Sequence, residues 1–188
     1  IRGTVDAMAS DDLEIWAGNQ TYIRGSVSLI GLPDINKTLI NLEAQDLRTT
    51  YRDAVNFIPA VARIHTPNLK KIDYLRFKGT YTGFINDFVS YGTIQTNLGT
   101  LTTDLNMKFP VNGEPQYLGK LSTQGFQLGQ FIHSPTLGLV AFDGTVRGTS
   151  FDWRKLDMEL NGVVHRIQYE DYTYQNITVE GKLARRLF

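Results

Sequence analysis

The alternation of apolar and polar side chains is the feature that most constrains this chain. Over residues 100–109, Leu, Thr, Leu, Met and Phe occupy the odd positions, whereas Thr, Thr, Asp, Asn and Lys occupy the even ones. A period of two places successive side chains on opposite faces of a β-strand. The same pattern recurs at residues 23–29, 75–81, 155–162 and 177–183. The sequence therefore predicts a sheet with one apolar and one polar face.

A short phrase built around glycine recurs along the chain. It occurs as RGTV at 2–5, RGSV at 24–27, KGTY at 78–81, LGKL at 118–121, DGTV at 143–146, RGTS at 147–150 and EGKL at 180–183. A glycine inside a strand admits curvature or the close approach of another backbone. Because the spacing is irregular, we interpret the phrase as a degenerate repeat in a sheet that grows along one axis.

Two segments interrupt the strand pattern. Thr49 or Thr50 is a suitable N-cap for a short helix near 49–58, which would stop at Pro59. The stretch GFQLGQFI indicates a further helical turn near 125–132. With 17 Gly and 6 Pro and abundant β-forming residues, the composition favours strands. We predict an all-β, mainly antiparallel, elongated and curved sheet with one or two short helices, forming a single segment over 1–188.

The composition and the motifs argue against several functional classes. Lys plus Arg equals Asp plus Glu at 19 each, so the basic surplus of a nucleic-acid binder is missing. The chain has no cysteine, and its three histidines are too widely spaced to suggest a metal site. No nucleophile elbow or phosphate-binding glycine loop occurs. We therefore expect a non-enzymatic protein that needs no cofactor and no metal.

Four stretches carry a resemblance to a known family. They are residues 28–59, residues 75–107 (LRFKGTYTGFINDFVSYGTIQTNLGTLTTDLNM), residues 117–132 (YLGKLSTQGFQLGQFI) and residues 169–188 (YEDYTYQNITVEGKLARRLF). Together they resemble the interior of the translocation and assembly module TamB family, within the AsmA-like group. The motifs are structural and degenerate, and they supply no catalytic residue.

The resemblance implies a periplasmic β-rich rod that is anchored in the inner membrane by an N-terminal helix. It further implies an open half-pipe, or β-taco-like groove, with an apolar interior. The family is implicated in outer-membrane protein assembly and in phospholipid transport between the two membranes. On this basis the expected partners are phospholipid acyl chains and, through other parts of a longer protein, an outer-membrane assembly protein. The chain would then be a segment cut from that longer protein.

The apolar positions of the alternating stretches are the candidate site residues, and we expect them to line the floor of the groove. They are Leu75, Phe77, Tyr81, Leu101, Leu105, Met107, Phe109, Leu121, Leu137, Leu139, Leu156, Met158, Leu160, Ile177, Val179 and Leu183. The alternation suits a filled core equally well, because grooves and cores share this pattern. Two further functions remain open at this point. One is a closed β-barrel that binds a small apolar ligand, and the other is a structural spacer.

Overall fold

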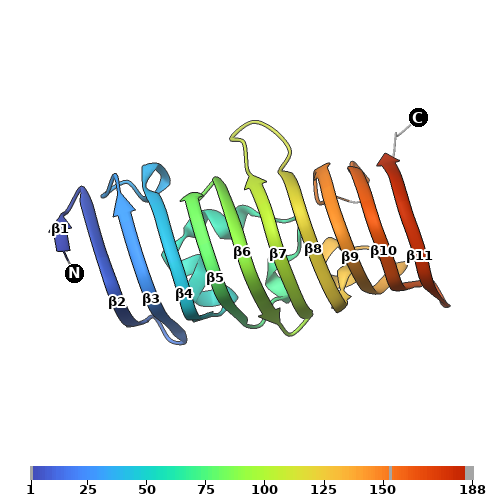
Figure 1. Cartoon of the computed structure of the whole chain (residues 1–188), viewed down its shortest axis with the longest axis horizontal. Coiled ribbons are helices and arrows are strands. Elements are labelled where there is room, and N and C mark those ends of the chain that lie inside the picture. Colours follow the sequence, from blue (N-terminus) through green and yellow to red (C-terminus); the bar gives the residue numbers. More distant parts are fainter. Residues whose placement is uncertain (1, 153, 185–188) are drawn as a thin grey trace.

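One antiparallel sheet forms the body of the molecule (Figure 1). The computed structural model describes residues 2–152 and 154–184. Within them, eleven strands lie side by side in the order of the chain. They are β1 Arg2–Thr4, β2 Ala7–Ala17, β3 Thr21–Ile30, β4 Leu39–Thr49, β5 Leu75–Phe84, β6 Asp87–Thr96, β7 Gly99–Lys108, β8 Gln116–Gln127, β9 Leu137–Thr149, β10 Asp157–Tyr169 and β11 Tyr172–Ala184.

The sheet is open. β1 and β11 lie at its opposite ends, and in the described residues β1 pairs only with β2 and β11 only with β10 (Figure 1). The predicted all-β antiparallel fold is confirmed. The alternative of a closed barrel is wrong, because closure would require the two end strands to pair with each other.

The pairing register gives the sheet two chemically distinct faces. Phe77, Ile94 and Leu101 are direct neighbours on β5, β6 and β7 and define what we call the inner face. Arg76 precedes Phe77 and Gln95 follows Ile94, so both side chains point to the opposite face, which we call the outer face. Every even position from 76 to 82 is exposed, as expected for a solvated polar face.

Directly paired glycines lie at the middle of the inner face. Gly79 on β5 pairs with Gly92 on β6, and both have a φ of 150°. A Cβ on Gly79 would overlap the carbonyl oxygen of Tyr91, and one on Gly92 would overlap that of Lys78. Only glycine adopts this conformation readily, so the glycine phrase at 78–81 marks a place where neighbouring backbones approach closely.

α1, α2 and the 3₁₀ helices that follow α1 lie behind the sheet in Figure 1. α1 spans Tyr51–Phe57 and α2 spans Leu128–Ile132, which confirms the expected short helices. The 3₁₀ helices are η1 Ile35–Lys37, η2 Pro59–Arg63 and η3 Leu69–Lys71. We call the segment 50–74 together with α2 the helical cap.

The start of α1 is fixed by a buried carboxylate. The Thr50 side chain accepts a hydrogen bond from the Asp53 backbone N–H at 3.3 Å, as an N-cap should. Asp53 is fully buried, and its carboxylate accepts hydrogen bonds from the backbone N–H groups of Asn19 and Gln20 and from the Thr21 hydroxyl. α1 is thereby attached to the turn between β2 and β3.

Within the helical cap, polar contacts attach the segment 50–74 to α2. The Asn68 backbone N–H donates to the Phe131 carbonyl at 2.6 Å, and the Asn68 amide contacts His133 Nε2 at 2.9 Å. The Phe131 ring packs edge-on against Phe126 of β8, with ring centroids 5.5 Å apart. Because Phe126 is buried in the sheet, this contact places α2 on the inner face.

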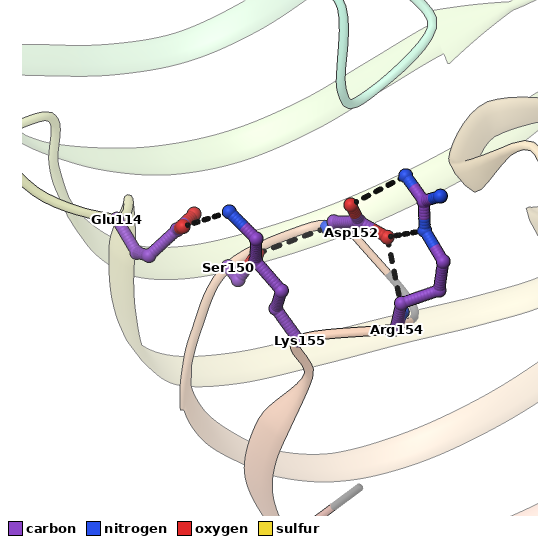
Figure 2. A network of polar contacts seen from close by, with 5 residues as sticks. All are labelled: Glu114, Ser150, Asp152, Arg154 and Lys155. Carbon is purple, nitrogen blue, oxygen red and sulfur yellow. Dashed lines mark hydrogen bonds and ion pairs between the residues drawn. The ribbon is translucent and has the colours of Figure 1, made fainter. Parts of the chain in front are cut away.

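Two loops meet at the opposite end of the strands, which we call the upper rim because it is uppermost in Figure 1. The buried Ser150 donates its backbone N–H to the Pro115 carbonyl at 2.8 Å. Lys155 Nζ lies 3.0 Å from Glu114 Oε1, and this contact lowers the pKa of Glu114 (Figure 2). The β7–β8 and β9–β10 connections are therefore joined to each other at this rim.

Candidate functional site

A band of apolar side chains runs along the inner face near the upper rim. All of its members are half-buried, so the band is neither a closed core nor a solvated surface. We call it the rim band, and its residues are Leu29, Ile40, Leu42, Tyr81, Phe88, Leu105, Met107, Phe109, Met158 and Leu160. Cross-strand pairing links them, for example Leu29 with Ile40, Leu42 with Tyr81 and Phe88 with Met107.

Aromatic rings occupy the centre of the rim band. Tyr81 stacks on Phe88 with ring centroids 4.6 Å apart, and Phe88 stacks on Phe109 at 6.2 Å. The Tyr81 hydroxyl donates to the Phe84 carbonyl at 2.8 Å. Burial raises the pKa of Tyr81 to about 12, so the phenol stays neutral at physiological pH. This part of the face is apolar and uncharged.

Towards β8, β9 and β10 the inner face is packed more tightly. Tyr117, Val140, Phe142, Val146 and Val164 form a buried cluster. Six candidate site residues pack against it, namely Leu105, Met107, Leu121, Leu137, Leu160 and Val179. These residues therefore act at least partly as core, and the apolar face is more filled here than at β5 to β7.

The other candidate residues differ in their positions. Phe77 is buried, and Leu75 and Leu101 are half-buried on the same face. Ile177 on β11 is 39% exposed. Leu156 precedes β10 and is half-buried. The backbone of Leu183 pairs with Met158, but its side chain lies outside the described part of the chain.

Leu139 does not share the inner face with the rest. It pairs with Gln127, whereas the adjacent Val140 pairs with Phe126 and Ile167 of the inner face. The cause is an irregular register between β9 and β10, where three steps along β9, from Val140 to Leu137, face two steps along β10, from Ile167 to Tyr169. This extra residue in β9 shifts the parity, so Leu137 and Val140 share the inner face and Leu139 lies on the other one. Sequence parity alone therefore assigned Leu139 where Val140 belongs.

Several residues of the apolar face are missing from the sequence-based set. Phe88, Phe126, Phe142, Val146 and Val164 all lie on it. The sequence could have identified them, because each lies on the inner face beside a residue of a paired strand once the strand pairing is known. For Phe88, the Met107 partner would have been sufficient.

A concavity lies on the other side of the sheet. A hollow of about 700 Å³ is lined mainly by charged and polar outer-face residues of β6 to β11, among them Lys108, Arg147, Asp157, Glu159 and Lys182. Two ion pairs border it, Lys108 with Asp87 and Lys182 with Asp157, each at 3.1 Å. Tyr117 and Leu118 are its two large apolar lining residues, and the other side chains around it are charged or polar, which does not suit a lipid tail.

The described residues contain no group of three or more His, Asp or Glu side chains that could hold a metal ion. Among the same residues, no helix has the length and the apolar character needed to cross a membrane. Comparisons of the chain with protein-family models, with curated proteins and with solved structures find no match.

Proposed function

We propose that this chain is a non-enzymatic segment of a periplasmic bridge whose apolar inner face supports phospholipid transport between the inner and outer membranes, outer-membrane protein assembly, or both. The observation that supports the proposal most directly is the rim band, whose half-buried apolar residues run from β3 to β7 and continue at Met158 and Leu160 of β10, beside the buried Tyr117 and Val146 of β8 and β9. The family resemblance of the sequence points to the same role.

The energetic argument concerns the cost of exposing a lipid tail to water. Each methylene group that leaves an apolar environment costs about 0.8 kcal/mol, so an acyl chain crosses an aqueous space only with continuous apolar cover. A strip that runs across successive strands follows the long axis of the sheet. An acyl chain lying along the strip could move from strand to strand with little change in free energy.

A structural spacer is the second candidate, and the filled cluster around Phe142 and Val146 favours it. A spacer requires only a stiff sheet, in which the inner face packs on itself and on the helical cap. The two functions differ in what the rim band contacts in the cell.

In vivo photocrosslinking tests the proposal. A photoreactive phenylalanine analogue at Tyr81 or Phe88 should capture phospholipid or an outer-membrane protein in the full-length protein. The matched control is Tyr91, an aromatic residue on the outer face of β6 that is 61% exposed. Adducts at Tyr81 and Phe88 but not at Tyr91 would support the proposal, and equal yields or none from the inner face would favour the spacer.

A charge test separates transport from folding. Met158→Asp should block transport while the protein remains soluble and folded, since Met158 is half-buried and is not among the residues packed against the buried cluster. Asn161→Asp introduces the same charge on the outer face of the same strand and should change neither property. If Met158→Asp unfolds the protein, residue 158 acts as core, and the transport role loses its support at this position.

A further inference from the structure

An exposed tryptophan stands on the polar outer face. Trp16 lies near the end of β2 and is 74% exposed. Its neighbour Ile15 is on the inner face, so Trp16, which pairs with Tyr22, points to the outer face. A large apolar side chain in this position gains little from folding, because most of its surface stays in water. A partner that covered the ring would gain the burial that folding does not supply.

The ring is held in a fixed arrangement with its neighbours. Trp16 and Tyr22 have ring centroids 4.4 Å apart, with planes at 46°. The Tyr22 hydroxyl donates to Glu14 at 3.2 Å, and the Arg48 guanidinium lies 5.7 Å from the Tyr22 ring centroid. The three planar groups come from β2, β3 and β4 and form a ladder across the strands.

Arg48 is fixed in turn by a carboxylate. Its Nε donates to Asp46 Oδ1 at 2.9 Å and its Nη2 donates to Oδ2, a bidentate contact. These hydrogen bonds, with the added attraction of Arg76 and Arg24, lower the pKa of Asp46. Arg48 is therefore neutralised by Asp46 and serves mainly to support the Tyr22 ring.

Two further arginines extend the ladder, and neither is held in a bidentate contact like that of Arg48. In the register Arg24 lies between Glu14 and Asp46, and Arg76 pairs with Arg48. Both side chains are exposed, and neither forms an ion pair with any residue in the described ranges 2–152 and 154–184. We call the set Trp16, Tyr22, Arg24, Arg48 and Arg76 the ladder patch.

We propose that the ladder patch docks an acidic segment of a partner protein, in which an apolar or aromatic side chain packs on Trp16 and carboxylates pair with Arg24 and Arg76. Trp, Tyr and Arg are the residues that dominate binding energy at protein interfaces. Because the rings and Arg48 are already ordered, little side-chain entropy is lost on docking. The inference uses the outer face and does not rest on the proposed transport function.

A protein segment fits the patch better than a membrane surface does. Glu14 and Asp46 lie among the arginines, and the chain as a whole has no net charge, so the long-range attraction to an anionic bilayer is small. The patch instead offers one apolar anchor on β2, with Arg24 on the adjacent strand and Arg76 three strands away along the same row. That combination suits a short segment with an aromatic residue between acidic ones.

Fluorescence anisotropy with labelled peptides tests the proposal on the full chain. The probe is fluorescein-labelled GDEFDEG, with GDEGDEG lacking the aromatic residue and GKRFKRG carrying reversed charge. We expect saturable binding of GDEFDEG, binding at least about tenfold weaker for GDEGDEG, and none for GKRFKRG.

Substitutions then assign the binding to the patch. Trp16→Ala and the double change Arg24→Glu with Arg76→Glu should each weaken GDEFDEG binding by about tenfold or more, whereas Trp16→Phe should retain most of it. Matched controls on the same face are Tyr91→Ala and the double change Lys120→Glu with Arg147→Glu, which should leave binding unchanged. Trp16→Phe also keeps the test valid if Trp16→Ala lowers stability.

Three results would overturn the proposal. The first is no saturable binding of GDEFDEG, which would make the ladder a stabilising feature of the sheet alone. The second is equal binding of GDEFDEG and GDEGDEG, or binding that is insensitive to Trp16. The third is binding of phosphatidylglycerol vesicles, lost on charge reversal of Arg24 and Arg76, without peptide binding, which would assign the patch to a membrane surface.

Discussion

At the scale of single residues, the sheet depends on positions where no side chain fits. Gly79 and Gly92 face each other with φ angles near those that only glycine adopts readily, and a Cβ on either would overlap a carbonyl oxygen of the paired strand. Gly79→Ala or Gly92→Ala should therefore lower the free energy of unfolding by about 2 kcal/mol. Urea denaturation measures this change.

The control for the glycine prediction is Gly181→Ala. Gly181 lies on the inner face of β11 opposite Leu160, and a Cβ there would meet nothing within 4 Å. The free energy of unfolding should change by no more than about 0.5 kcal/mol. Equal losses at Gly79 and Gly181 would contradict the steric explanation.

The Asp53 carboxylate should make stability depend on pH. Hydrogen bonds from the Gln20 backbone N–H, and then from Asn19 and Thr21, lower the pKa of Asp53. The stabilisation is present above the unfolded-state pKa of about 4 and is lost as the pH falls through the lower, folded-state pKa. Asp53→Asn should thus be less stable than the wild type at pH 7, and thermal unfolding should show this deficit shrinking below about pH 4.

Thr50→Ala provides the uncharged comparison at the same helix start. It removes the N-cap acceptor and should cost about 1 kcal/mol. Because a hydroxyl does not ionise in this range, the deficit should stay nearly constant from pH 7 to pH 3. A Thr50→Ala deficit that shrinks in parallel with that of Asp53→Asn would mean that the cap itself is released at low pH.

At the scale of elements, the helical cap is held to the sheet by a small number of side chains. Phe131 of α2 packs edge-on against the buried Phe126 of β8. Phe131→Ala should lower the free energy of unfolding by about 2 kcal/mol, since the ring is half-buried. Phe57→Ala removes a ring of α1 that is 49% exposed and should cost no more than about 0.5 kcal/mol in the same denaturation experiment. Similar losses at both positions would show that α1 and α2 contribute equally to packing.

The elements themselves were largely predictable from the sequence, and the reasons are local. Strand alternation reflects backbone geometry within one strand. Thr50 caps α1 by a contact with Asp53, only three residues along the chain. The misplacement of Leu139 has a different origin, because the extra residue of β9 between Leu137 and Val140 is defined only by the pairing with β10. The open sheet could likewise not be distinguished from a barrel, since closure depends on whether the first and last strands meet. The ladder patch was missed for the same reason: its members come from β2, β3, β4 and β5 and become neighbours only through the register.

At the scale of the whole molecule, the topology makes the sheet nearly one-dimensional. Within the described residues, each strand pairs only with its neighbours in sequence, as Figure 1 shows. In such an array, stability is approximately a sum of local and nearest-neighbour contributions. The buried cluster of β8 to β10 concentrates the packing in the C-terminal half, so the two halves of the sheet should differ in local stability.

Native-state hydrogen exchange measures that difference. Backbone amides of β8 to β10 should exchange most slowly, and those of β1 and β2, where β1 is only three residues long, should exchange fastest. Val146→Ala removes part of the buried cluster and should speed exchange in β8 to β10 while leaving β2 to β4 unchanged. Ala44→Gly, at a buried position of β4, should speed exchange in β2 to β4 and leave β8 to β10 unchanged. If either substitution accelerated exchange uniformly along the chain, the sheet would unfold as one cooperative unit. The inner face would then be a single core rather than a series of locally stable segments.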